Sequence, residues 1–475
     1  MTGAARTSGI SLVLRPEVAV QAPTDGPVTL EAPWARIALG SVGHGVRSAL
    51  RLLTDQGASE DALVDQVTQH DGTGALATLY YCLRSCIQHR FLCHAVSMAG
   101  QRTITVVPMT AEPFSAPAHL DPAARFRLSR FAFARGGSGA LVIESPLAPV
   151  RVLLHGQQGG VLLATLAEPV SADELPTAMA GSTADEARDV LTVLVATRLI
   201  AAVDDDGTIA AEEAPTMRTW EFHDLLFHTR SRRGRHDLEY GGTYRFREQL
   251  PPLPALKPST SNRIVSLRRT ELDGLADDSF GHVLEVRCST REFAEAPLTV
   301  DQLGELLHRA ARVRSVLPVG EARPYEVTRR PYPGGGAAYE LELYPLVHRC
   351  DGLDPALYHY DPGGHQLELI AARSDRTDQL LSDAKWSSGA TQPPHVLVVV
   401  AARFGRLTWK YGAMAYALLL KDVGVLLQTM CLVATSMGIG ACALGGGDAD
   451  LFAAVAGTDY YAETSVGELI LGTTR

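Results

Sequence analysis

The sequence predicts an α+β fold, in which a duplicated N-terminal half is followed by a separate C-terminal domain. Its 475 residues are enough for about three domains. In the N-terminal half, the order strand, strand, three helices, strand occurs twice. A proline-rich stretch, Pro251 to Ser261, then marks a connector. Beyond it, helical and strand patterns alternate, which is typical of a mixed domain.

The two copies begin with similar strands, Val28 to Pro33 and Leu141 to Pro146. Apolar periodicity predicts five further elements after each strand. In the first copy they are Trp34 to Leu39, Val46 to Leu53, a short acidic helix holding Leu63, Gly74 to His89 and Phe91 to Val96. In the second copy they are Val150 to His155, Gly160 to Leu166, a short acidic helix holding Leu175, Ala184 to Leu199 and Ile200 to Val203.

Helix starts in the second copy carry clear signals. Ser171 with Glu174, and Thr183 with Glu186, have the capping-box spacing that satisfies free backbone N–H groups. The turn from Asp204 to Gly207 predicts a wing after the last strand. We therefore expect two winged-helix-like modules, at 16–105 and 137–215.

The ligand of these modules is predicted to be a peptide. The long helix of the second copy starts with acidic residues, Asp185 and Glu186, which would repel a nucleic-acid phosphate. A peptide added along a strand edge beside a helix fits better. A role in packing or dimerisation alone stays open.

The remainder divides into a connector at 216–262 and a domain at 263–475. Thr299 with Gln302 predicts a capped helix to about Arg312. Later elements are strands at Tyr339 to His348, His395 to Ala402 and Ser465 to Leu471, and a single fully buried helix over Val423 to Leu444.

Composition excludes several classes of function. A net charge of -10 and a pI near 5.8 argue against nucleic acid or an anionic membrane as partner. Met1 to Gly9 lacks the apolar core of an export signal, so we expect a cytoplasmic protein. Seven cysteines without a CxxC pair indicate reduced thiols. Cys82, Cys86 and Cys93 could be drawn as a zinc site, but buried apolar cysteines are favoured, and no metal site is predicted.

The pair Lys410 and Tyr411 is the first candidate for chemistry. Only four lysines occur in this chain, because arginine supplies most of its positive charge. A partly buried lysine can lose its proton and act as a base, which arginine cannot do. The alternative is a lysine that lies over Trp409 with its ammonium in water.

Two further groups of residues suit a flat, phosphorylated ligand. Arg287, Ser289 and Arg291 alternate, so in an extended segment all three point to one side and can hold a phosphate. Glycine clusters at Pro331 to Gly336 and Gly438 to Asp448 allow backbone to approach a ring closely. No GxGxxG follows the first strand of a βαβ unit, which disfavours a Rossmann nicotinamide site.

In order along the chain, five motifs resemble the flavin-dependent nitroreductase superfamily, and within it the SagB-type dehydrogenases that form thiazoles and oxazoles. The resemblance covers about residues 216 to 475. The motifs are Phe222 to His228 with Gly241 to Phe246, Arg287 to Arg291, Arg330 to Pro333 through Tyr344, Leu357 to Asp361, and Lys410 to Gly412. The N-terminal modules are similar to the peptide-binding winged helices of longer members.

This resemblance implies FMN as cofactor and assigns its ligands. Arg287, Ser289 and Arg291 would hold the phosphate and ribityl chain, and Arg475 would be a second phosphate ligand. Pro333, Gly334 and Gly335 would lie along the isoalloxazine, with Gly334 in place of the family's usual serine. Gly445 and Gly446 would offer backbone N–H groups to flavin N5. Lys410 and Tyr411 would be the catalytic base, with the amine made neutral by burial and by nearby arginines.

The implied function is oxidation of thiazoline and oxazoline rings to aromatic azoles in a ribosomally made peptide, after a cyclodehydratase has closed the rings. A homodimer would complete the site, with the Val423 to Leu444 helix as its seam. Two alternatives stay open. One is an FMN-dependent reductase of a nitroaromatic, quinone or dehydroamino acid, and the other is a peptide-binding scaffold with a vestigial flavin site.

Overall fold

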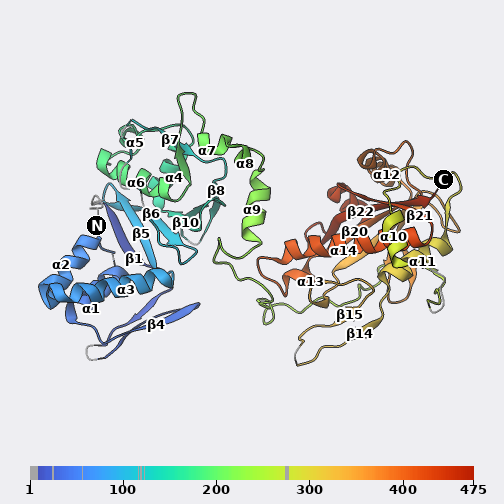
Figure 1. The fold of residues 1–475 in the computed structure, drawn as a ribbon, viewed down its shortest axis with the longest axis horizontal. Coiled ribbons are helices and arrows are strands. Elements are labelled where there is room, and N and C mark those ends of the chain that lie inside the picture. Colours follow the sequence, from blue (N-terminus) through green and yellow to red (C-terminus); the bar gives the residue numbers. More distant parts are fainter. Residues whose placement is uncertain are drawn as a thin grey trace. The chain divides into compact units, whose positions relative to one another are not determined.

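The computed structural model describes residues 9–474, apart from 24–25, 56, 116, 118–119, 122, 138, 273–277 and 322. The chain divides into two compact units, Met1–Leu238 and Glu239–Arg475 (Figure 1). The bounds of the four regions predicted from the sequence stay predictions.

The first unit begins with the module predicted from the first sequence copy. Leu30, Leu50, Leu63, Leu79 and Phe91 meet in its core and are fully buried. The predicted order of elements is confirmed by β2 (Ala19–Gln21), β3 (Val28–Ala32), β4 (Ala35–Gly40), α1 (His44–Asp55), α2 (Glu60–Asp71), a 3-10 turn (Thr73–Ala75), α3 (Leu76–Gln88) and β5 (Leu92–Met98).

The second module repeats this order. Both predicted caps are present: the Thr183 hydroxyl accepts from Glu186 N–H at 3.2 Å, and the Ser171 hydroxyl accepts from Glu174 N–H at 3.3 Å. Its elements are β7 (Phe126–Leu128), β8 (Phe133–Gly136), β9 (Leu141–Glu144), β10 (Val150–Leu154), α4 (Gly156–Thr165), α5 (Leu175–Ala178), α6 (Ala184–Ala196), β11 (Ile200–Ala202), α7 (Ala210–Glu213), α8 (Pro215–Arg218) and α9 (Phe222–Arg230).

The two modules share one sheet. β1 (Ile10–Leu14) and β6 (Gln101–Pro108) complete a six-stranded sheet in the order β1-β5-β6-β10-β9-β8. The wing predicted at Asp204 to Gly207 is wrong as a hairpin. The turn forms, with Gly207 N–H donating to Asp204 at 2.9 Å, but the chain then enters α7. Strand β11 pairs with β7 instead.

The second unit is built on a seven-stranded antiparallel sheet, in the order β12-β19-β18-β16-β20-β22-β21. Its strands are β12 (Ile264–Ser266), β16 (Leu341–Val347), β18 (Ala356–Asp361), β19 (Gln366–Ala372), β20 (Val396–Arg403), β21 (Ile439–Leu444) and β22 (Glu463–Thr473). Short pairs add β13 (Leu298–Thr299) with β17 (Cys350–Asp351), and β14 (Ser315–Leu317) with β15 (Val327–Arg329). This antiparallel arrangement confirms the α+β class.

Helices cover both faces of this sheet. Along β20, Val398 and Val400 pack in one core with α11 (Val300–Ala311) and α14 (Ala415–Ser436). Val399 faces the other way, toward α12 (Asp375–Ser388) and α15 (Ala449–Ala456). Alternate side chains of a strand point to opposite faces, so β20 is buried on both sides. Helices α10 (Phe280–Val286) and α13 (Gly405–Thr408) complete the unit.

The single buried helix predicted over Val423 to Leu444 is wrong in two respects. Helix α14 ends at Ser436, because Gly438 turns the chain with φ 65° into strand β21. It is also only partly buried, with Tyr416, Leu420, Gly424 and Gln428 exposed along one side. By length and composition α14 could cross a membrane, but its other side packs into the core of the second unit.

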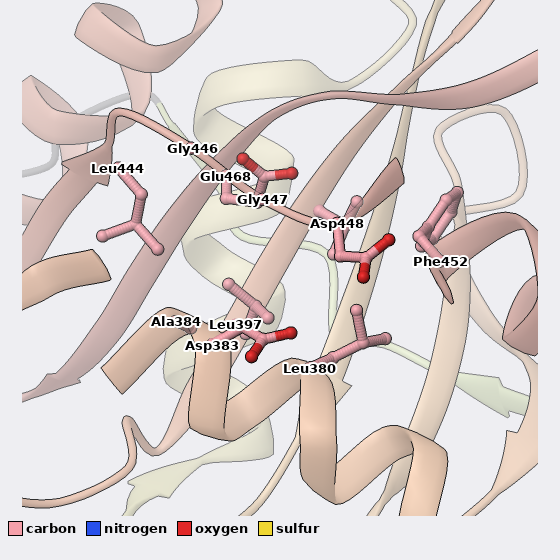
Figure 2. A pocket seen from close by; sticks show the side chains of 11 residues that line it. Leu380, Asp383, Ala384, Leu397, Leu444, Gly446, Gly447, Asp448, Phe452 and Glu468 are labelled. Atoms are coloured by element: carbon pink, nitrogen blue, oxygen red, sulfur yellow. The ribbon is translucent and has the colours of Figure 1, made fainter. Parts of the chain in front are cut away.

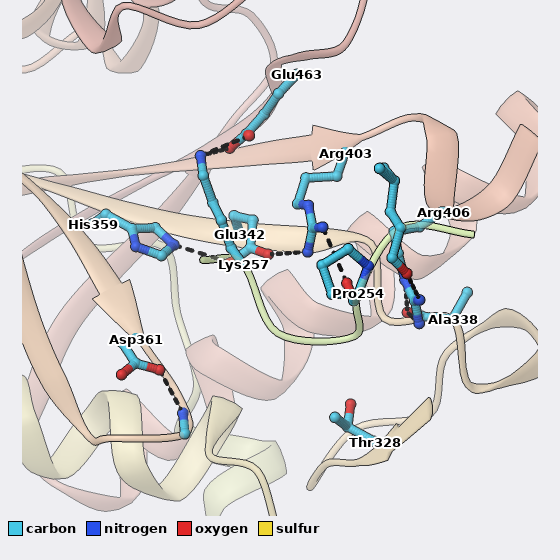
Figure 3. Close-up of polar contacts among 12 residues, drawn as sticks. Pro254, Lys257, Thr328, Ala338, Glu342, His359, Asp361, Arg403, Arg406 and Glu463 are labelled. Atoms are coloured by element: carbon cyan, nitrogen blue, oxygen red, sulfur yellow. Dashed lines mark hydrogen bonds and ion pairs between the residues drawn. The ribbon is translucent and has the colours of Figure 1, made fainter. Parts of the chain in front are cut away.

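A part of the predicted connector is fastened to the second unit. The buried Arg406 side chain donates to the carbonyl of Leu253. Arg403 donates to the carbonyl of Pro254 at 3.0 Å (Figure 3). The Trp409 indole N–H donates to the Leu250 carbonyl at 2.7 Å. The proline-rich stretch is therefore held against the segment that carries Lys410.

Candidate active site

Lys410 and Tyr411 lie between α13 and α14, where their backbone pairs with an earlier segment. Tyr244 N–H donates to the Lys410 carbonyl at 3.0 Å, and Gly412 N–H donates to the Gly241 carbonyl at 2.9 Å. The motif from Gly241 to Phe246 thus lies beside Lys410 to Gly412. These two stretches are far apart in the sequence, and their pairing gives both catalytic candidates a fixed backbone.

The Lys410 amine lies among tyrosines. Its Nζ donates to the Tyr325 hydroxyl at 2.5 Å and is 3.4 Å from the Gly336 carbonyl. It is 4.9 Å from the ring centroid of Tyr325, 5.0 Å from that of Tyr411 and 5.7 Å from that of Tyr244. A cation at these distances is attracted to the faces of the rings. Lys410 therefore does not lie over Trp409, which packs against Tyr244 and Tyr325 instead.

The expected lowering of the Lys410 pKa is wrong for this arrangement. Burial alone lowers the pKa, but the hydrogen bond to Tyr325 and the nearby hydroxyls of Tyr411 and Tyr244 outweigh it and raise the pKa above its ordinary value. Burial likewise raises the pKa of Tyr411, despite the Lys410 cation. At neutral pH the pair is an ammonium beside a phenol, and the neutral amine is a minor form.

A strained glycine loop lies directly against this pair. Gly336, Ala337 and Tyr339 all have positive φ, at 58°, 55° and 45°. Such a cluster that includes two non-glycine residues stores strain and is found preferentially at functional sites. A Cβ added to Gly336 would lie 2.2 Å from Lys410 Nζ and 2.3 Å from the Tyr411 hydroxyl. The lysine and the tyrosine occupy the space that a side chain at 336 would need.

Replacing Gly336 by alanine should displace Lys410 and Tyr411, and we expect more than a tenfold loss of turnover. The substitution also costs about 1 kcal/mol because the backbone is left-handed there. The measurement is turnover by purified protein whose flavin content matches wild type. Gly160→Ala is the matched control, since a Cβ at Gly160 meets nothing within 4 Å. Equal turnover of Gly336→Ala and Gly160→Ala would contradict the close approach.

The preceding glycines of the loop are fixed from two sides. A Cβ at Gly334 would lie 3.1 Å from ring carbons of Tyr339, so a side chain there would require the Tyr339 ring to shift by a few tenths of an ångström. Gly335 packs against Leu418 of α14, and its N–H donates to the Asp422 carboxylate at 2.9 Å. Pro333 to Gly335 therefore forms a rigid backbone surface that a flat ring could lie along.

The predicted phosphate ligands lie at another part of the unit. Arg287 follows α10, and Thr290 N–H donates to the Ala441 carbonyl of β21 at 3.0 Å, which holds the Arg-x-Ser-x-Arg segment beside that strand. Among the described residues, the side chains of Arg287, Ser289 and Arg291 form no hydrogen bond or ion pair. Their donors are free for an anion, so they fit the FMN phosphate.

The second glycine loop, Gly445 to Gly447, connects β21 to α15. Side chains at Gly445 and Gly446 would meet nothing within 4 Å, so their backbone is open to a ligand. Figure 2 shows the loop beside a small pocket lined by residues of α12 and α15, with the Glu468 carboxyl group next to Gly447. Burial raises the pKa of Glu468.

The structure brings some of the predicted residues together and keeps others apart. Lys410, Tyr411 and the loop from Pro333 to Gly336 form one group. Arg287 to Arg291 and the second loop both adjoin β21 and form another. No hydrogen bond or ion pair between described residues joins these two groups. Arg475 lies outside the described residues.

Two important residues were missed by sequence reasoning. Tyr325 donates its hydroxyl to the Gly336 carbonyl at 2.7 Å and accepts from Lys410. Asp422 anchors Gly335. A signal for Tyr325 existed, because Arg323-Pro324-Tyr325 repeats the Arg-Pro-Tyr of residues 330–332. Asp422 lies in an apolar run without any such signal.

Three family models match this chain. The model "ThcOx helix turn helix domain" matches residues 7–114, "Cyanobactin oxidase ThcOx" matches residues 126–237, and "Nitroreductase family" matches residues 284–473. A putative nitroreductase of Methanocaldococcus jannaschii is 28% identical over 175 residues, which are 37% of this chain and 82% of its own length.

The microcin B17-processing protein McbC of Escherichia coli is 30% identical over 115 residues, which are 23% of this chain and 42% of McbC. Among solved structures, a putative nitroreductase from Ralstonia eutropha matches with a TM-score of 0.35 and 23% identity, over 47% of this chain and 95% of the other. The E. coli microcin synthetase McbBCD complex with truncated pro-MccB17 bound matches with a TM-score of 0.33 and 21% identity, over 49% and 91%.

The C-terminal unit is accordingly a nitroreductase-family oxidoreductase domain, a class whose cofactor is FMN. The predicted fold class, with helix-turn-helix modules before this domain, is confirmed. Together with the ThcOx models that match on the N-terminal side, this domain confirms the predicted resemblance to SagB-type azoline oxidases of the nitroreductase superfamily.

Proposed function

We propose that this protein oxidises thiazoline or oxazoline rings of a ribosomally made precursor peptide to aromatic azoles, with Lys410 and Tyr411 as its proton-handling residues. The observation that carries the proposal is the packing of Lys410, Tyr411 and Tyr325 against the strained Gly336 loop of a nitroreductase domain. Matches to ThcOx models and to McbC point to azolines as the substrate class.

When bound, FMN supplies the acceptor for the hydride that leaves the ring. The residues of this chain handle the other half of the reaction, the ring proton. The neutral form of Lys410 takes this proton at Nζ, and Tyr325 and the Gly336 carbonyl hold the resulting ammonium. Tyr411 remains a phenol and orients the substrate by donating its proton in a hydrogen bond. The backbone pairing with Gly241 and Tyr244 holds Lys410 and Tyr411 in a fixed position.

Arg287 and Arg291 are proposed to bind the FMN phosphate. Replacing both by alanine should weaken FMN binding at least tenfold, because each removes a charge-assisted hydrogen bond worth about 1.5–3 kcal/mol. The measurement is FMN affinity by fluorescence titration of the apoprotein. Arg376→Ala is the control, since Arg376 is exposed on α12. Unchanged FMN affinity of the double variant would remove Arg287 and Arg291 from the phosphate site.

A homodimer is proposed to bring the two groups of site residues together. The exposed side of α14 carries Tyr416 and Leu420 with exposed fractions of 48% and 42%, and a second copy could cover it. A peptide bound by the N-terminal modules and a cyclodehydratase that delivers azolines are the further partners. The McbBCD complex with truncated pro-MccB17 bound supports the peptide and the cyclodehydratase as partners.

The decisive experiment is mass spectrometry of a synthetic azoline peptide after incubation with the FMN-loaded protein and dioxygen. Each oxidation removes two hydrogen atoms, so the mass decreases by about 2 Da per ring, and an azole absorbance appears. Rapid bleaching of the flavin by NADPH, with an unchanged azoline peptide, would overturn the proposal in favour of a reductase.

A further inference from the structure

Two buried carboxyl groups lie behind the glycine loop of the site. Glu340, immediately before β16, is 0% exposed, and Asp422, on α14, is 6% exposed. The two groups face each other. Neither has a place in the mechanism above, and burial of two acids against one another is costly unless something stabilises them.

The hydrogen bonds of the two groups differ. Asp422 accepts from Gly335 N–H at 2.9 Å. Neither carboxyl oxygen of Glu340 has a partner with good hydrogen-bond geometry among the described residues. Two facing carboxylates repel, and a buried carboxylate without a donor loses its hydration. One proton held between Glu340 and Asp422 removes the repulsion and supplies the missing bond.

The surroundings decide which group carries that proton. Burial and the Asp422 carboxylate raise the pKa of Glu340 to about 8, although Arg330 opposes them. The pKa of Asp422 is raised by burial, while Gly335 N–H, Glu340 and Lys421 act to lower it. A further titratable neighbour of Glu340, Tyr332, is buried and its pKa is raised, so it stays neutral. Glu340 is therefore the acid and Asp422 the carboxylate at neutral pH.

We propose that the Glu340–Asp422 pair, holding one shared proton, positions Lys410 for the reaction proposed above. The path runs through the loop. Asp422 holds Gly335 N–H, and the carbonyl of the following residue, Gly336, accepts from Tyr325 and faces Lys410. Loss of the proton drives the two carboxylates apart and loosens the loop. Glu340 and Asp422 are thus positioning residues, and this role rests on the proposed function.

Three variants test this role by turnover. Glu340→Ala and Asp422→Ala should lower kcat at least tenfold with FMN still bound, because each breaks the pair. Glu340→Gln should stay within about twofold of wild type, since its amide can donate to Asp422. Wild-type kcat should stop rising with pH above about 8, whereas that of Glu340→Gln should continue to rise. Wild-type turnover in Glu340→Ala, or identical pH profiles of wild type and Glu340→Gln, would overturn the proposal.

Thermal unfolding tests the Glu340–Asp422 pair without any substrate. The folded-state pKa of Glu340 is raised from its ordinary 4.5 to about 8, so its contribution to stability is full below 4.5 and is lost as the pH rises to 8. Glu340→Gln has no such loss. The melting temperature of Glu340→Gln minus that of wild type should therefore increase between pH 5 and pH 8. A constant difference would refute the buried acid. If wild type oxidised no azoline while the difference grew, the function alone would have failed.

Discussion

Lys410→Ala should retain bound FMN and lose azoline oxidation by about 10²- to 10⁴-fold, the usual contribution of a positioned general base. Its Nζ donates to the Tyr325 hydroxyl and lies beside Gly336, so removal of the amine leaves no other basic side chain among the groups that contact it. Initial rates are measured by mass spectrometry of an azoline peptide, with flavin content measured by absorbance.

Lys410→Arg tests whether Lys410 acts as a base or only supports the loop through its positive charge. Arginine keeps the charge and the donors but cannot be deprotonated. Because the tyrosines raise the pKa of Lys410, the reactive neutral fraction of wild type should increase about tenfold per pH unit, and turnover should rise between pH 6 and pH 8. Lys410→Arg should lack this rise. Lys385→Ala, on α12, is the control. A Lys410→Arg variant with wild-type turnover and pH profile would exclude the base.

Arg406→Ala should give the largest loss of stability, about 3 to 5 kcal/mol, because it leaves three carbonyl groups, each at least partly buried, without this donor. The guanidinium is 3% exposed, and it donates to Leu253 at 2.6 Å, to Glu326 at 3.0 Å and to Ala338 at 2.7 Å. These carbonyls belong to the connector, to the segment before β15 and to the end of the glycine loop. Figure 3 shows Arg406 directed at Ala338.

Thermal unfolding of the FMN-loaded protein measures this loss. For a unit of this size, we expect the melting temperature to fall by about 10 °C. Arg406→Lys should recover little, because one ammonium cannot reach three separated carbonyls in the geometry of a guanidinium fork. Arg376→Ala should leave the transition unchanged. A melting temperature of Arg406→Ala within about 2 °C of wild type would show that water replaces these bonds.

Local patterns were enough to place most elements, for reasons that particular residues show. Thr183 with Glu186 and Thr299 with Gln302 both form the capping boxes expected of them, since a cap depends on a few neighbouring residues. The end of α14 was misplaced, because the apolar composition continues through Gly438 into β21 and composition alone does not distinguish a buried helix from a buried strand.

Sequence alone determined the family, the cofactor class and the candidate residues Lys410, Tyr411 and Arg287, because motifs in a fixed order carry that information. Only tertiary structure decided the electrostatics of Lys410. Its tyrosine neighbours come from positions 244, 325 and 411, and their proximity raises a pKa that burial alone would lower. The pairing of Glu340 with Asp422 likewise joins a strand start to a helix 82 residues later. Interactions of this kind depend on distances in space. The folded structure sets these distances, and a local stretch of sequence does not.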